Sequence, residues 1–326
     1  MAPRITKILD GPSCLQAVRT LIATGKPVRA AVAYWGRGAI EQVGINTNSK
    51  MQIVCDVRSG GCNTEVVSDL IKLLGPENVK THDQMHAKIW INDDTVIIGS
   101  SNVSANGLGF ENSEVAGNTE VNIITTAIDE VMHTRDWYET VWEKARTISR
   151  NDMAVGAARR LLTRHSRSVP EDNDILQALL RDPASLSDRK LFVWVRRRLA
   201  ADPWVPDELE WVKEDRQDEE IDYYSNVDFP FEPGSTIIDL EVYRNKVGAV
   251  GMYEVLKDRH IHKQRDGDGT LLLCRGVEKF QGTMPLGSEE MWRAAGQLTW
   301  LDEGEGIWTA PDFSTYLSRV PLGDKG

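Results

Sequence analysis

Cysteine is scarce in this sequence, which has four in 326 residues: Cys14, Cys55, Cys62 and Cys274. No two of them form a Cys-x-x-Cys pair, and none lies in a cluster with histidine. These spacings exclude a disulfide scaffold and disfavour a structural zinc site. We therefore expect reduced, largely buried thiols in a cytoplasmic protein.

Long apolar stretches are also missing. The longest runs, 28–35 and 51–57, have the length of strands and fall far short of the roughly 18 residues of a membrane helix. The N-terminal MAPRITKILDG has no charged segment followed by an apolar one, so we expect neither secretion nor a membrane partner. With 41% apolar and 27% charged residues, the composition is that of a soluble globular protein, and the length suggests about two domains.

An excess of positive charge is absent as well. The formal net charge is −11, which argues against a protein that coats nucleic acid non-specifically. The charge is uneven, however: residues 1–150 are nearly balanced at −2, residues 151–200 carry +4, and residues 201–326 carry −13. A local basic surface, and with it a nucleic-acid partner, stays compatible with this distribution.

Residues 1–150 alternate between helical and strand patterns. Apolar spacing predicts helices over 12–24, 63–74 and 127–146, and strands over 28–35, 51–57, 86–91, 95–99 and 120–125. Strands that alternate with helices predict an α/β sheet with helices on its faces. We expect this segment to be one domain.

The remaining residues divide into two parts. Residues 151–205 are predicted to form a basic helical connection, in which a helix over 185–200 carries Arg196, Arg197 and Arg198. These arginines suit either a phosphate-contacting surface or a solvated helix end. Residues 206–326 are predicted to form a strand-rich domain of unknown role, with strands over 236–242, 249–256 and 270–275.

The chemically informative segment runs from His86 to Asn102. His86 and Lys88 are two residues apart on a predicted strand, so their side chains point to the same side of the sheet. The next predicted strand ends at Gly99-Ser100-Ser101-Asn102. If the two strands pair, a histidine, a lysine and an asparagine converge. Such a cluster can bind a phosphodiester, with histidine as nucleophile or general acid.

This order of residues resembles the signature of the phospholipase D superfamily, His-x-Lys followed by Asp and then Gly-Ser-x-Asn. The resemblance covers residues 5–150 and implies a mixed sheet flanked by helices. It implies that His86 attacks phosphorus, that Lys88 and Asn102 hold the non-bridging oxygens, that Ser100 supports the pocket, and that Asp93 is structural. The gap from Asp93 to Gly99 is one residue shorter than in many members.

The family also places a glutamate after this motif to orient the histidine, and two residues compete for that position. Glu120 opens the predicted strand 121–125, where the family glutamate usually lies, but requires an insertion around 109–117. Glu114 keeps nearly the usual spacing. We favour Glu120, and Glu114 remains a candidate for substrate contact.

Only one His-x-Lys motif is present, whereas the family's chemistry needs two histidines. Single-motif members that resemble this chain are bacterial nucleases, including metal-independent restriction endonucleases, which build one site across a twofold axis. The resemblance thus implies a homodimer that uses no metal and no other cofactor.

Two weaker features accompany the motif. Arg58 follows the strand 51–57, together with Asp56 and Asn63, at the sheet edge where α/β proteins bind ligands, and a turn-forming role is equally compatible. Tyr34 ends the strand 28–35 and suits either stacking on a nucleic-acid base or ordinary packing.

Three functions fit these observations. The leading one is a nuclease, with DNA as the expected substrate and the C-terminal half selecting it. The second is a phospholipase or phosphatidyl transferase, which the absence of a secretion signal, anchor or amphipathic apolar helix disfavours. The third is a phosphate-recognising binding module without turnover, which intact His86, Lys88 and Asn102 disfavour.

Overall fold

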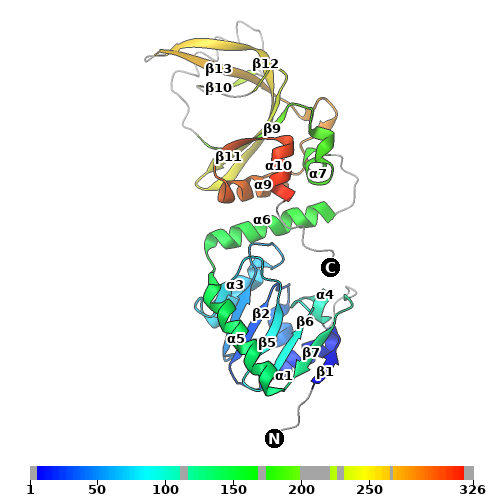
Figure 1. Cartoon of the computed structure of the whole chain (residues 1–326). Coiled ribbons are helices and arrows are strands. Elements are labelled where there is room, and N and C mark those ends of the chain that lie inside the picture. The colour runs from blue at the N-terminus through cyan, green and yellow to red at the C-terminus, as the bar shows by residue number, and fades with distance from the viewer. Residues whose placement is uncertain are drawn as a thin grey trace. The chain divides into compact units, whose positions relative to one another are not determined.

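The computed structural model describes residues 6–110, 117–167, 174–198, 221–225, 231–264 and 267–318 (Figure 1). The chain divides into two compact units, one of Met1–Thr163 with Pro321–Gly326 and one of Arg164–Val320. The predicted α/β class is confirmed: the first unit holds a large mixed sheet flanked by helices, and the second unit holds a separate sheet.

The sheet of the first unit has eight strands in the order β1-β7-β6-β5-β2-β3-β4-β8. The bounds are β1 (Thr6–Leu9), β2 (Val28–Val32), β3 (Met51–Cys55), β4 (Val79–Thr81), β5 (Lys88–Ile91), β6 (Val96–Gly99), β7 (Asn122–Thr125) and β8 (Arg146–Thr147). The strands β2, β3 and β4 run parallel, and the other neighbours pair antiparallel. Each predicted strand of residues 1–150 is present in shortened form, while β1, β4 and β8 had no clear pattern.

Helices cover both faces of this sheet. Its helices are α1 (Gly11–Ala23), α2 (Ala39–Val43), α3 (Thr64–Leu74), α4 (Ala105–Leu108), α5 (Ile128–Lys144) and α6 (Arg150–Arg167). One face carries the main core, in which α1, α2 and α3 pack around Trp35 and Trp90. The other face carries a smaller core under α5, with Val131 and Tyr138. Asp10 and Asn63 cap α1 and α3 by accepting backbone N–H bonds in the first turn.

The second unit is built on a six-stranded sheet in the order β10-β13-β12-β11-β9-β16. Its strands are β9 (Leu191–Arg197), β10 (Ile221–Ser225), β11 (Thr236–Tyr243), β12 (Lys246–Gln264), β13 (Gly267–Gly276) and β16 (Gly306–Thr309), beside a short hairpin of β14 (Lys279–Phe280) and β15 (Met284–Pro285). Its helices are α7 (Ile175–Arg181), α9 (Glu289–Asp302) and α10 (Ala310–Ser318), with a 3₁₀ turn at Pro183–Leu186. The three strands predicted in this region are confirmed.

The predicted helix over 185–200 is wrong, because this segment contains the strand β9. The residues Leu-Phe-Val-Trp-Val from Leu191 to Val195 are β-branched or aromatic at most positions, and pairing with β11 and β16 outweighs the helical spacing. Arg196 is not a solvated cation: its guanidinium makes a bidentate ion pair with buried Asp239 and also contacts Glu241. Arg196 is therefore not available to the basic surface considered above, whereas Arg197 and Arg198 are exposed at the end of β9.

An ion-pair network joins the start of α6 to the loops of the first sheet. Asp152, which is buried, accepts hydrogen bonds from Arg146 Nη1 at 2.6 Å and Ser149 Oγ at 2.6 Å, and lies 3.5 Å from Arg58 Nη1. Arg146 also bonds Asp83. Burial opposes ionisation of Asp152, but the bonds from Arg146 and Ser149 outweigh it and hold the pKa of Asp152 below its usual value of 3.8.

We predict that Asp152→Asn lowers the free energy of unfolding by about 2–3 kcal/mol at pH 7, because it leaves Arg146 and Arg58 without their shared carboxylate. A depressed carboxyl pKa gives stability that is present above 3.8 and is lost as pH falls through the folded pKa. Urea unfolding should therefore show the same deficit at pH 7 and pH 5 and a smaller one below 3.8. Asp136→Asn, an exposed position on α5, is the control and should match wild type; an equal loss there would contradict the network.

Candidate functional site

The candidate site lies at one edge of the first sheet, around a continuation of β2. After Val32 the backbone from Ala33 to Gly36 receives bonds from the surrounding loops. Ala33 N–H donates to Ala87 O at 2.9 Å, Tyr34 O accepts from Val103 N–H at 3.1 Å, and Gly36 N–H donates to Val103 O at 2.7 Å. The segment before β5 and the segment after β6 are thus fixed against the same short stretch of chain.

His86 and Lys88 lie at the start of β5 and share one side of the chain. The strand begins at Lys88, two residues later than predicted, so His86 belongs to the preceding loop. His86 is exposed, whereas Lys88 is 5% exposed. Lys88 Nζ donates a 2.7 Å hydrogen bond to His86 O. The lysine therefore fixes the backbone of the histidine as well as bringing a positive charge to the site.

Tyr34 contacts both residues of this pair. Its ring centroid lies 5.8 Å from the His86 ring in an edge-on arrangement, and Lys88 Nζ lies 5.7 Å from the Tyr34 centroid. Gly61 lies directly against the tyrosine ring, and a Cβ at Gly61 would lie 2.3 Å from it. Sequence reasoning left Tyr34 as either a stacking contact for a base or a packing residue; the structure shows its ring next to both His86 and Lys88.

The turn Gly99–Asn102 after β6 is held by Asn122, which opens β7. Asn122 Oδ1 accepts Ser101 N–H at 3.3 Å, and Asn122 Nδ2 donates to Ser101 Oγ at 2.8 Å. Gly99 is required here because a Cβ would lie 2.0 Å from Asn122 Oδ1. Sequence reasoning did not identify Asn122. The available signal was a polar residue inside the otherwise apolar strand segment 121–124.

Asn102 follows in this turn and is linked to the β2 continuation through Val103. Gly107 approaches its backbone so closely that a Cβ would lie 2.4 Å from Asn102 O. Among the described residues, Asn102 Oδ1 is buried without a hydrogen-bond partner. An orphaned buried amide oxygen is costly, so this side chain is kept polar at a position where ordinary packing would favour an apolar residue.

Ser100 and Glu120 form a hydrogen-bonded pair beside the turn. Ser100 Oγ donates to the Glu120 carboxylate and accepts Val121 N–H at 3.1 Å. Glu120 therefore lies just before β7, next to the Gly99–Asn102 turn. Glu114, the competing candidate, lies outside the described residues.

Two other candidates lie in structural contacts. Asp93 belongs to the turn at the far end of β5 and pairs with Arg135 of α5 at 3.6 Å, in agreement with a structural role. Arg58 is held by Asp152 of α6. Asp56 before it is buried, and burial raises its pKa, while it accepts Ser59 N–H to close the turn after β3. The turn-forming interpretation of the 56–63 segment is favoured by these contacts.

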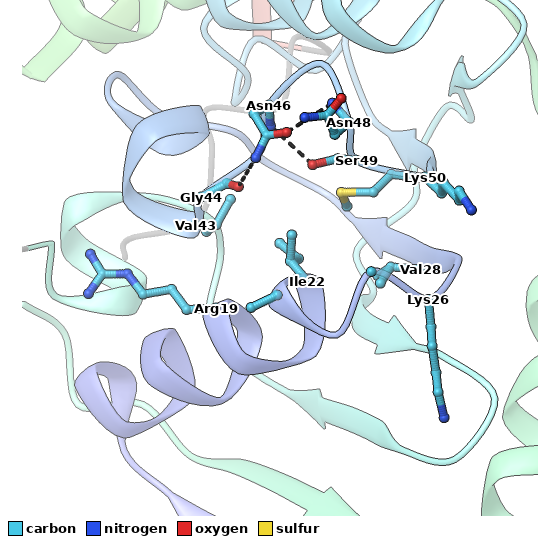
Figure 2. A pocket seen from close by; sticks show the side chains of 13 residues that line it. Arg19, Ile22, Lys26, Val28, Val43, Gly44, Asn46, Asn48, Ser49 and Lys50 are labelled. Atoms are coloured by element: carbon cyan, nitrogen blue, oxygen red, sulfur yellow. Dashed lines mark hydrogen bonds between the residues drawn. The ribbon is translucent and has the colours of Figure 1, made fainter.

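A cavity of about 450 Å³ lies at the opposite edge of the sheet, near the starts of β2 and β3 (Figure 2). Arg19, Lys26 and Lys50 line it, but Figure 2 shows their side chains extending in three different directions. Arg19 donates to Gln42, and Lys26 pairs with Asp94. These cations do not converge on one anion, so the cavity is not a second phosphate site.

The described residues give no indication of a metal centre or of a membrane helix. Within them, no three His, Cys, Asp or Glu side chains are grouped as a metal site requires. None of the helices in the described ranges combines the length and hydrophobicity of a membrane-spanning segment.

No protein-family model and no curated protein sequence matches the chain. Similar solved structures include NucT from Helicobacter pylori, 19% identical with a TM-score of 0.35, over 45% of this chain and 100% of that chain. They also include Nuc from Salmonella typhimurium, a phospholipase D family member, 16% identical with a TM-score of 0.33, over 45% of this chain and 99% of that one. Phosphatidylserine synthase from Haemophilus influenzae is 10% identical with a TM-score of 0.36, and the match covers 95% of this chain and 88% of that chain.

The superfamily that the His86–Asn102 motif resembles is thus represented among the solved structures similar to this chain. Identities of 10–19% and TM-scores of 0.33–0.36 establish no shared activity. What the site can do therefore has to follow from its own residues.

We predict that Tyr34→Ala lowers kcat for phosphodiester cleavage by about 10- to 100-fold, because His86 and Lys88 lose the ring that orients them. Tyr34→Phe is the matched control: it keeps the ring and should stay within about 5-fold of wild type. Steady-state kinetics and thermal melts of both variants provide the test. Equal activity of the Ala and Phe variants, both folded, would show that the ring does not position the site.

Proposed function

We propose that the first unit is a phospholipase D-type phosphodiesterase that cleaves nucleic acid, with DNA as its substrate. The observation that carries the proposal is the meeting of exposed His86, buried Lys88 and the Gly99–Asn102 turn around Tyr34. An exposed imidazole beside a lysine and an amide suits nucleophilic attack on an anionic phosphodiester.

The first chemical step breaks the bond between phosphorus and the leaving oxygen. A ring nitrogen of His86 donates its lone pair to phosphorus, and Lys88 and Asn102 hold the non-bridging oxygens, on which negative charge accumulates. The leaving oxygen takes a proton from a second histidine, which a single motif does not supply. In the second step that histidine removes a proton from water, the water oxygen bonds to phosphorus, and the phosphohistidine bond breaks.

Ser100 and Glu120 act on this site through position. The hydrogen bonds between Glu120, Ser100 and Val121 fix the start of the Gly99–Asn102 turn. Asn122 fixes its middle through Ser101. Together they keep the Asn102 amide at a constant place relative to Lys88, which is what stabilising a transition state requires.

The second histidine is supplied by a second copy of the chain, so the active unit is a homodimer with one composite site. The sequence contains no second His-x-Lys motif from which the same chain could provide it. A twofold axis close to the phosphate would bring two copies of His86 to opposite sides of it. The nucleophile and oxygen ligands are protein side chains, so the reaction needs no metal.

We predict that His86→Ala lowers the cleavage rate by about 10⁴-fold or more, since it removes a covalent nucleophile. The assay uses DNA, RNA and phosphatidyl lipid as substrates, each once with EDTA and once with Mg²⁺. The wild-type protein should cleave DNA under both conditions. His133→Ala, an exposed histidine on α5, is the matched control and should remain active. Full activity of folded His86→Ala would reject the nucleophile, strict dependence on Mg²⁺ would reject the mechanism, and cleavage of lipid alone would reject the substrate.

The composite site makes a separate prediction for mixed subunits. After verified exchange of equal amounts of wild-type and His86→Ala chains, random pairing leaves about a quarter of dimers with two histidines, so activity should fall to about a quarter. A titration of the variant into wild type measures the dependence. Activity proportional to the wild-type fraction would show that each chain holds a complete site.

A further inference from the structure

Three strands at one end of the first sheet expose a row of isoleucines. Ile8 of β1 lies directly opposite Ile123 of β7, and Ile98 of β6 lies opposite Ile123 from the other side. Their side chains are 77%, 44% and 42% exposed, in that order. Val121, two residues before Ile123, is 57% exposed. Residues two apart on a strand share a face, so Val121 extends the row.

The row lies on the face of the sheet that α5 covers only in part. Val96, two residues before Ile98, packs in the core under α5, which places Ile98 and its neighbours on that face. The helix α5 packs against β5 and β6, and Figure 1 shows β7 and β1 farther along the sheet, toward its edge. The first turns of α5, which follows β7 in the chain, also expose Ile128 and Met132, at 54% and 53%. We call the row on the strands, Ile8, Ile98, Val121 and Ile123, the isoleucine patch.

The composition of the isoleucine patch restricts what can cover it. Single exposed apolar residues are normal, but an aligned row across three strands is typical of an interaction surface. The apolar side chains of the patch offer no positive charge to the phosphate backbone of the substrate, and their burial is favourable against another apolar surface.

The isoleucine patch reaches the candidate site. Val121 O accepts the Ser100 N–H at 3.0 Å, and Val121 N–H donates to Ser100 Oγ at 3.1 Å. Ser100 in turn bonds Glu120. A partner that covers the patch therefore sits beside Ser100 and Glu120, the pair proposed to position the Gly99–Asn102 turn.

We infer that the isoleucine patch is the surface on which a second copy of this chain docks. The inference rests on the proposed function, because the one-motif site is incomplete without a second His86 and the patch is the apolar surface continuous with that site. An apolar patch is self-complementary, which a twofold interface requires: the same surface faces itself. Contact through the patch also removes Ile8, Ile98 and Ile123 from water.

The first test is Ile123→Arg, which places a charge at the centre of the row. We expect the dimer dissociation constant to rise by about 100-fold or more, because the guanidinium is buried against apolar side chains of the other copy. Cleavage activity should fall in parallel and recover in part at high protein concentration. The matched control is Tyr243→Arg, because Tyr243 is also an exposed large apolar residue, at 55%, and belongs to the second unit. Sedimentation equilibrium of the full chain gives the dissociation constants.

A second variant covers the case in which Ile123→Arg fails to fold. The four native cysteines are buried, so Val121→Cys introduces an accessible thiol beside the site. A short bis-maleimide should cross-link two Val121→Cys chains in high yield, because the twofold axis must pass close to the composite site. The same reagent should leave Tyr243→Cys uncross-linked.

The outcomes separate this inference from the proposed function. A dimer that survives Ile123→Arg, with no cross-link through Val121→Cys, places the interface elsewhere and overturns the inference while cleavage by wild type stands. Dimerisation through the patch without cleavage of any phosphodiester keeps the interface and rejects the enzyme. A fully active monomer rejects both. Binding of lipid vesicles by monomeric wild type, lost in Ile123→Arg, assigns the patch to a membrane surface and overturns the second copy as its occupant.

Discussion

The backbone from Ala33 to Gly36 is the constraint on which the site depends. It continues the central strand β2 beyond the sheet and accepts or donates hydrogen bonds to the segments that hold Ala87 and Val103. The same stretch also bonds Asp56 and Asn63 from the loop after β3. These bonds fix the loops relative to one another. Because each bond replaces a hydrogen bond with water, its net contribution to stability is modest, about 1 kcal/mol. The catalytic groups then inherit a rigid frame from the middle of the sheet.

Burial divides the roles of the motif residues. Lys88 is nearly inaccessible, and a buried ammonium is costly unless anions or carbonyl oxygens surround it. The carbonyl of His86 and the face of Tyr34 supply part of that compensation, and a bound phosphate would supply the rest. His86 is exposed and keeps the access that a nucleophile needs. The site is therefore organised to favour an anion before any substrate arrives.

At the same edge of the sheet, a single chain provides only part of the site that the proposed reaction needs. Its charged side is complete, with lysine, asparagine and the Ser100–Glu120 pair in place, but a two-step displacement needs a second proton donor. The isoleucine patch is exposed on the same face of the sheet on which α5 covers the core with Val96, Val131 and Tyr138. The proposed docking of a second copy would remove both deficits in one event. The same interface would then complete the catalytic site and bury the isoleucine patch.

The sequence by itself determined the α/β class of the first unit and most of its helices and strands, and it supplied the residues that we propose to be reactive. These follow from local apolar spacing and from a motif whose members lie close together in the chain. It failed at 191–197, where apolar spacing fitted both a helix and a strand, and pairing with β11 decided for the strand. Edge strands of two to four residues such as β1 and β8 left too few positions for a pattern.

Only the tertiary structure decided which groups meet. Tyr34 and His86 are 52 residues apart in the chain, and their contact depends on the pairing of β2 with β5. The role of Asn122 depends on its register opposite Gly99, and the isoleucine patch depends on the register of β1, β7 and β6. Long-range pairing fixes such contacts, and no local property of the sequence encodes them. For Arg58 the sequence suggested a contact that the structure does not favour. Its position after a strand suggested a substrate-binding role, but α6 packs so that Arg58 pairs with Asp152.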